Sequence, residues 1–446
     1  MKKSLLAVAA MTAFAGAAQA QSSVTVYGIL DVGFIGGNTT SATTAPKNGA
    51  AAVTKTTGNQ FGNSAEQTSR MGFKGTEDLG NGTQAVFTAE FALAPTDTVL
   101  SGNPASTGST GGSTNGGLQN RQTFVGLHKN GLGQAAIGTQ YTGIHNAVCA
   151  TDPGQCNNMM GNVIYASSAG AVTNAYNSAN GNTFAYTVRM DNSLTFQSDS
   201  FSGFRANGMA VLNNKNANQY QYTGVAVGGV ATGDQAGGTT NTNGWGLGAD
   251  YTWNKLFVSA QYQAFKQFTT ATGTPAQPFT VAGAGLIAIT PTVTGSSGTG
   301  SASVPLTQGL NIQDNQGYVG ATYDFGILKA YANWVTRKAS AANDSSQYLK
   351  RSAEQIGVRS FITPTIEAWG SAGLGRYQAY GAGQPTANFN AWQLGSNYWL
   401  SKRTNLYAIY GATTTSNYAT ISAAGATTAV ASSAGQNYAI GVRHTF

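Results

Sequence analysis

Charge is what this chain has least of. Only 9% of its 446 residues are Asp, Glu, Lys or Arg, against about 25% in typical soluble domains. Beyond its first segment the chain also has no run of about 20 apolar residues, which argues against membrane-spanning helices. These two scarcities disfavour both a large soluble protein and a helical membrane protein.

Histidine and cysteine are also scarce. His128, His145 and His444 lie in different segments without a nucleophile motif, so we expect neither enzyme activity nor a cofactor. Cys149 and Cys156, with only His145 nearby, lack the ligand count for a zinc site, and we expect no metal. If the chain is exported, a disulfide between the two cysteines is the favoured alternative.

The net charge of +7 is spread over single basic residues rather than runs. Nucleic-acid binding would require clustered Lys and Arg, so we do not expect it.

The first twenty residues have the pattern of an export signal. Lys2 and Lys3 precede the apolar stretch 5–17, and Ala18-Gln19-Ala20 is a small-residue cleavage pattern. The apolar stretch is too short to span a bilayer as a helix. We therefore expect residues 1–20 to be a cleaved signal peptide and residues 21–446 to form the mature domain.

What the mature chain does contain is alternation of apolar and polar residues with a period of two. This pattern predicts sixteen strands, at 23–35, 68–79, 83–94, 119–129, 133–141, 182–197, 204–213, 243–253, 256–267, 313–325, 327–337, 351–361, 365–376, 391–400, 404–413 and 436–446.

Short and long connections alternate strictly along these strands. Asn-Gly pairs and similar hairpin residues form the short turns. The long connections are polar and rich in Gly, Ser, Thr and Ala; they are 36–67, 95–118, 142–181, 214–242, 268–312, 338–350, 377–390 and 414–435. The alternation predicts an all-β fold, a 16-stranded antiparallel transmembrane β-barrel with short periplasmic turns and long extracellular loops.

The last strand shows the two faces that such a barrel needs. Tyr438, Ile440 and Phe446 fall on one face, whereas Asn437 and Arg443 fall on the other. In the strand 327–337, Leu328, Ala330, Ala332 and Trp334 are expected to face lipid and Lys329, Tyr331, Asn333 and Arg337 to face water. A barrel of this many strands leaves an aqueous channel rather than a packed interior.

Several stretches resemble the general porins of Gram-negative bacteria, in particular the trimeric type of betaproteobacteria. They are SVTVYG at 23–28 with Asp31, SRMGFKGTEDLG at 69–80, RQTFVGL at 121–127, RMDNS at 189–193 and the terminal Phe446. The resemblance implies a homotrimer in the outer membrane, in contact with its lipids, with the third loop folded into the bore. It also implies that Tyr438 and Phe446 act as a signal for the barrel-assembly machinery.

The resemblance also implies a basic ladder of Arg70, Arg121 and Arg189 in the constriction, which Lys74 extends. Alternation places Arg70 opposite Met71 and Phe73, Arg189 opposite Val188 and Met190, and Arg121 opposite Phe124. All three arginines should therefore face water. Pairing with an acid such as Glu90 is the alternative role for each of them.

The third loop, 142–181, has a single acid, Asp152, which we expect to face the arginines. The net positive constriction predicts a general diffusion channel for small hydrophilic solutes with weak anion preference. A substrate-specific channel and a loop-mediated adhesin are the alternatives. The scattered lumen aromatics argue against the first, and the aromatic-poor loops argue against the second.

Overall fold

The computed structural model describes residues 23–44, 52–96, 119–166, 183–214, 226–227, 230–231, 241–270, 280–282, 286–288, 309–341, 348–379, 386–421 and 427–446. The expected signal peptide lies outside these residues. Within them, no helix has the length and apolar character that a membrane crossing requires.

The described elements are almost all strands. They are β1 (Ser23–Thr44), β2 (Ala52–Asn63), β3 (Arg70–Gly80), β4 (Thr83–Ala92), β5 (Asn120–Lys129), β6 (Gly133–Tyr141), the helix α2 (Gly143–Thr151), β7 (Arg189–Ser198), β8 (Phe204–Asn214), β9 (Ala226–Val227), β10 (Val230–Ala231), β11 (Asn241–Trp253), β12 (Leu256–Thr270), β13 (Thr280–Ala282), β14 (Leu286–Ala288), β15 (Gly309–Asp324), β16 (Lys329–Ala341), β17 (Tyr348–Phe361), β18 (Ile366–Ala379), β19 (Ala387–Trp399), β20 (Thr404–Ile421) and β21 (Thr427–Thr445).

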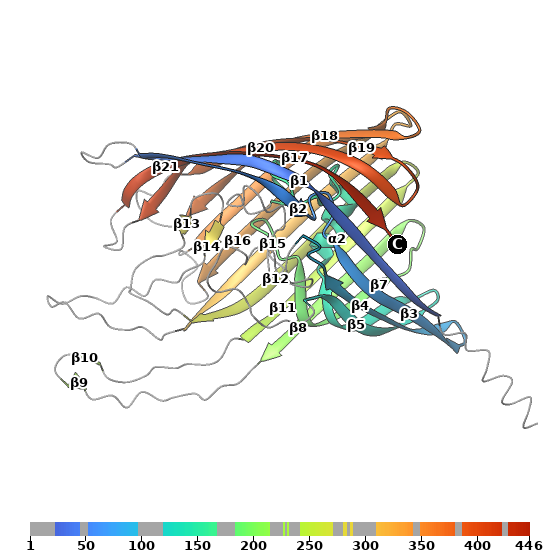
Figure 1. Cartoon of the computed structure of the whole chain (residues 1–446). Helices are drawn as coiled ribbons and strands as arrows, with labels where there is room; N and C mark the ends of the chain where they lie inside the picture. The colour runs from blue at the N-terminus through green and yellow to red at the C-terminus, as the bar shows by residue number, and fades with distance from the viewer. Residues whose placement is uncertain are drawn as a thin grey trace, which may run out of the picture.

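One antiparallel sheet closes on itself through its first and last strands (Figure 1). β1 pairs with β21 from Ile29↔Thr445 to Thr44↔Val430. The other edge of β1 pairs first with β3 and then with β2, so β2 and β3 together take one place in the wall. The predicted closed barrel of sixteen strands is confirmed.

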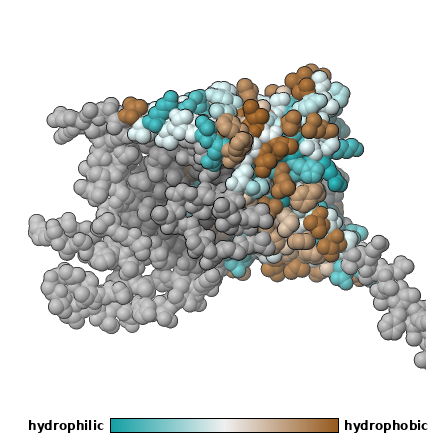
Figure 2. Space-filling model, in the orientation of Figure 1, coloured by the Kyte–Doolittle hydropathy of each residue, from teal (hydrophilic) through white to brown (hydrophobic). Residues whose placement is uncertain are grey.

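The two faces of the barrel follow the alternation of the sequence. Trp334 is 43% exposed whereas its neighbour Asn333 is 5% exposed, and Ile440 is 63% exposed whereas Asn437 is 2% exposed. Large apolar side chains lie on the outer surface, where Figure 2 shows hydrophobic patches over the described part of the wall. A soluble barrel would reverse this arrangement, so the outer face is suited to lipid.

Outward-facing aromatic side chains form two belts. Tyr251, Tyr323, Tyr398 and Phe446 lie near the short turns, and Trp245, Trp334, Trp392 and Tyr438 lie toward the loops. Tyr251 and Trp245 on β11 are separated by about 20 Å along the strand. Two such belts mark the two interfaces of a membrane.

Two of the predicted long loops are largely strand. In the predicted loop 36–67, β1 continues to Thr44 and β2 pairs with it from Val32↔Asn63 to Thr43↔Ala52. In the predicted loop 414–435, β20 continues to Ile421 and β21 begins at Thr427. Both predictions were wrong because Thr, Asn, Gly and Ala show little apolar alternation, although their backbones pair well with a neighbouring strand.

Candidate functional site: the constriction inside the barrel

The described parts of the third loop lie inside the barrel (Figure 1). Its first segment is the helix α2, which starts at an N-cap: the Thr142 Oγ1 accepts a hydrogen bond from the His145 amide at 3.2 Å. After α2 the chain runs along the inner face of β15–β21, and it returns to the wall through 183–188.

The loop is fixed to the opposite wall by inward-facing amide side chains. The Asn157 Nδ2 donates to the Gln393 Oε1 at 2.8 Å, and the Gln393 Nε2 donates back to the Asn157 Oδ1 at 2.8 Å. The Met160 amide donates to the Asn437 Oδ1 at 3.0 Å, and the Val163 amide to the Gln355 Oε1 at 3.1 Å. The last two bonds satisfy loop backbone amides that would otherwise be buried without partners.

Three inward arginines that the sequence did not single out as site residues complete this attachment, and a fourth, Arg443, contacts Glu66 outside the third loop. Arg337, Arg351 and Arg359 donate to the backbone carbonyls of Thr183, Val163 and Pro153 at 2.9, 2.6 and 2.7 Å. Arg443 on β21 lies 3.5 Å from Glu66. Their positions in the period-two alternation indicated that these arginines face the lumen, but nothing in the sequence identified their partners.

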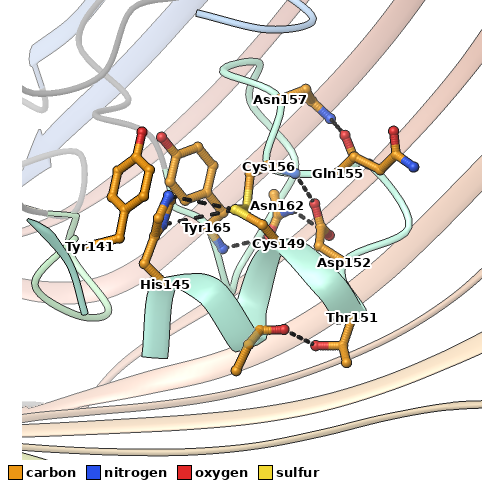
Figure 3. The surroundings of a disulfide bond; sticks show 12 residues. Tyr141, His145, Cys149, Thr151, Asp152, Gln155, Cys156, Asn157, Asn162 and Tyr165 are labelled. Carbon is orange, nitrogen blue, oxygen red and sulfur yellow. Dashed lines mark hydrogen bonds between the residues drawn. A yellow bond between two sulfur atoms is a disulfide. The ribbon is translucent and has the colours of Figure 1, made fainter. Parts of the chain in front are cut away.

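The predicted disulfide between Cys149 and Cys156 is confirmed, with an S–S distance of 2.10 Å (Figure 3). It joins the last turn of α2 to the segment that follows. The His145 Nε2 lies 3.6 Å from the Cys149 Sγ. Because both sulfurs are in the covalent bond, neither is a thiolate that could bind a metal together with His145.

Asp152 does not face the arginines. Only 1% exposed, it accepts hydrogen bonds from the Cys156 amide at 2.8 Å, the Asn162 Nδ2 at 2.8 Å and the Gln355 Nε2 at 3.0 Å. Burial raises its pKa, and these hydrogen bonds oppose the rise. The prediction of a carboxylate opposite the ladder is therefore wrong: Asp152 holds the loop together (Figure 3).

Arg121 and Glu90 form a buried ion pair on the side of the barrel where the chain enters the loop. The Arg121 Nε lies 2.8 Å from the Glu90 Oε1, and the Arg121 Nη2 donates to the Tyr141 hydroxyl at 2.6 Å. The Tyr27 hydroxyl donates to the Glu90 Oε2 at 3.1 Å. The side chain of Arg121 is thus held rigidly, and much of its charge is balanced.

Arg70, Arg189 and Lys74 have more open surroundings. The Arg70 Nη2 donates to the Gln67 Oε1 at 3.0 Å, and Gln67 itself donates to the Gln155 carbonyl of the third loop at 2.7 Å. The Lys74 Nζ lies 5.3 Å from the centre of the Tyr27 ring. Within the described chain, none of these three cations has an ion-pair partner.

Simple alternation failed in two of the strands that carry the arginines. Phe124 faces the lumen beside Gln122, where both line a cavity of about 410 Å³ under α2. Arg121 reaches the lumen because the β4–β5 register shifts between Glu90 and Phe91. A second shift, between Gly138 and Gln140, interrupts β6–β7, and Met190 is buried at 8% exposure. The predictions that Phe124 and Met190 face outward were wrong.

His145 lies close enough to Arg189, Arg121 and Arg70 for their charges to act on it. Burial lowers its pKa well below the ordinary value of 6.5, and the charges of Arg189, Arg121 and Arg70 lower it further. The side chain is 7% exposed and its Nδ1 lies 3.2 Å from the Tyr186 hydroxyl. The imidazole is therefore neutral at physiological pH and does not add a charge to the constriction.

This histidine gives a testable dependence of stability on pH. In the unfolded chain it binds a proton below about pH 6.5, whereas in the folded chain it does not, so acidification favours unfolding. Between pH 7.5 and 5 we expect the free energy of unfolding to fall, with a slope approaching about 1.4 kcal/mol per pH unit from this group. The His145→Gln variant should lack this component in denaturant titrations of the folded protein in detergent. Parallel curves for the two proteins would contradict the assignment.

Comparison with known proteins agrees with this architecture. The family model described as Gram-negative porin matches residues 7–348 and 290–418. An outer-membrane porin protein of Bordetella pertussis is 29% identical over 413 residues, covering 92% of this chain and 94% of the relative. The major outer-membrane protein P.IB of Neisseria meningitidis serogroup B is 36% identical over 140 residues, which are 31% of this chain and 33% of that protein.

Solved structures show the same fold. An anion-selective porin from Comamonas acidovorans superposes with a TM-score of 0.58 at 20% identity, covering 96% of this chain and 100% of the other. A trimer form of OmpT of Vibrio cholerae gives a TM-score of 0.54 at 12% identity, covering 95% and 99%. The family match over most of the chain and the closed sixteen-stranded wall lead to one conclusion: this chain belongs to the Gram-negative porins of the outer membrane.

Proposed function

We propose that the constriction makes this general diffusion porin weakly selective for anions. The observation that carries the proposal is the charge around α2. Four cations, Arg70, Lys74, Arg121 and Arg189, and the carboxylate Glu90 give an excess of three positive charges (4 − 1). Arg205 and Asp250, which line the cavity under α2, offset each other. Asp152 is turned into the opposite wall and does not offset the four cations. A positive, water-filled narrowing attracts anions and repels cations.

The anion preference has a direct test in planar bilayers. A porin that passes ions without a substrate site should give stepwise, ohmic currents. Under a tenfold KCl gradient the reversal potential should have the sign that marks chloride as the more permeant ion, and the potential should shrink as salt rises because the charges are screened over about 8–10 Å. A reversal potential of the cation-selective sign would overturn the proposal.

We further propose that the working unit is a homotrimer from which residues 1–20 have been removed, inserted among outer-membrane lipids by the barrel-assembly machinery. Trimeric forms among the structural neighbours support the first part. For insertion, the supporting feature is β21, where Tyr438 and Phe446 are 38% and 41% exposed on the outer face. Phe446 also exchanges two backbone hydrogen bonds with Gly28 of β1, each 3.1 Å long.

A further inference from the structure

Three cations face outward on adjacent strands near the loop end of the barrel: Lys338 on β16, Lys350 on β17 and Arg376 on β18. Their outward direction follows from their sequence neighbours, because Arg337, Arg351 and Tyr377 are buried inside the barrel at 7%, 2% and 3% exposure. Near the loop end, the barrel wall thus carries basic residues on both its inner and its outer face. The inner arginines bind the third loop, whereas the outer cations have no such partner in the described chain.

The register brings the three outward cations together. Lys338 is directly opposite Lys350, and Arg376 is directly opposite Ser352, which places it diagonally from Lys350. In antiparallel sheets direct partners have Cβ atoms about 5 Å apart and diagonal ones about 7–8 Å apart. Like charges placed directly opposite each other destabilise a sheet, so this arrangement calls for a compensating anion.

The described chain does not supply that anion. None of the three cations forms an ion pair there, and Lys338 only rests with its Nζ 4.5 Å from the centre of the Tyr348 ring. Glu354 is exposed on the same face, diagonal to Arg376, but the two make no ion pair. The surface keeps an excess of two positive charges (3 − 1).

An apolar groove adjoins the cations on the side of the membrane centre. It has a volume of about 660 Å³, and its lining includes the apolar side chains of Val319, Trp334, Ile356 and Leu374. The polar residues of the lining are Asn333, Glu354, Gln355 and Asn390. The side chains of Ile356 and Leu374 are 69% and 56% exposed. A groove of this kind on a membrane-facing wall accommodates a hydrocarbon chain.

We propose that this surface is a binding site for a phosphorylated, acylated glycolipid of the outer leaflet. Its phosphate is bound by Lys338, Lys350 and Arg376, and one acyl chain occupies the groove. The cations lie toward the loops, which places them at the outer surface of the membrane, where a basic cluster attracts anionic headgroups. The guanidinium of Arg376 offers the paired donors that a phosphate accepts.

The test uses folded full-length mature protein in detergent and bisphosphorylated lipid A as the probe, with bound lipid counted by native mass spectrometry. We expect the Lys338→Gln/Lys350→Gln/Arg376→Gln variant to bind it at least about tenfold more weakly, since each cation near a headgroup contributes on the order of a factor of five. The matched control is Lys255→Gln/Lys402→Gln/Arg403→Gln, which removes three cations from the short turns and should bind as the wild type does.

Two further measurements identify the source of the phosphate and the role of the groove. Inorganic pyrophosphate should not displace lipid A, whereas Leu374→Asn should weaken binding while leaving the cations in place. Equal binding by the triple variant and the wild type would overturn the proposal, and so would pyrophosphate binding as tight as that of lipid A. Channel currents of each variant report separately whether it has folded. They also keep this test distinct from that of the proposed function. If the triple variant does not fold, the single variant Lys350→Gln replaces it in the binding measurement.

Discussion

Replacing Arg70 and Arg189 together by glutamine is expected to remove most of the anion preference. In a water-like medium a unit charge about 5 Å from a permeating ion contributes roughly 0.8 kcal/mol, which favours one sign of ion about fourfold. Two such charges multiply to about sixteenfold before screening, so their loss should lower the ratio of anion to cation permeability by up to about this factor at low salt, and by less at high salt. Reversal potentials under a KCl gradient measure this ratio.

Arg121 is left in place in that experiment because its ion pair with Glu90 is part of the wall. Lys402→Gln, which removes a cation from a short turn, is the matched control and should leave the reversal potential unchanged. The double substitution Arg70→Lys/Arg189→Lys should retain the preference, since it keeps both charges. If the glutamine variant retained the wild-type potential, the selectivity would have to arise elsewhere in the channel.

Replacing Glu367 by alanine is expected to cause the largest loss of stability. Arg359 and Glu367 form a buried bidentate pair, with the Arg359 Nη2 2.6 Å from the Glu367 Oε2, and the Arg359 Nη1 donates to the Pro153 carbonyl of the third loop at 2.7 Å. Removing one partner leaves a buried charge unpaired, which costs about 3–5 kcal/mol. Denaturant titration of the barrel in detergent measures this change.

The matched double variant is Arg359→Met/Glu367→Leu, which removes both charges and keeps the volume. Its stability should return to within about 1–2 kcal/mol of the wild type. Only the double variant removes the Arg359 donor to the Pro153 carbonyl, so it should give noisier open-channel currents as the loop moves against the wall. Quiet currents in the double variant would show that the other wall contacts suffice to hold the loop.

The sequence predicted the barrel because the strands of a membrane barrel alternate outward apolar residues with inward polar ones. Trp334 outward and Arg337 inward followed from counting residues, and so did Arg70, whose strand has no irregularity before the turn. The disulfide was also predictable, since two cysteines in one loop offered each other the best partner.

The positions of Arg121 and Asp152 depended on contacts between strands and loops, which the alternation of residues along one strand does not reveal. The position of Arg121 requires a shift in the pairing of β4 with β5, which depends on both strands at once. Asp152 was expected to face the arginines as the one acid of the third loop, but Asn162 and Gln355 solvate it inside the protein. Gln355 is 203 residues away in the sequence, too far for a local pattern to indicate the pairing.

The attachment of the third loop to the far wall also sets an order of events during biogenesis. Asp152, Asn157 and Met160 find their partners 203, 236 and 277 positions later in the chain. Contacts between such distant segments form late, because the intervening chain must first be brought together. A polypeptide halted before β17 would have the contacts of the loop to β15 and β16, but not the partners of Asp152, Asn157 and Met160. The narrowing of the pore is therefore completed only when the last five strands, β17–β21, are in place.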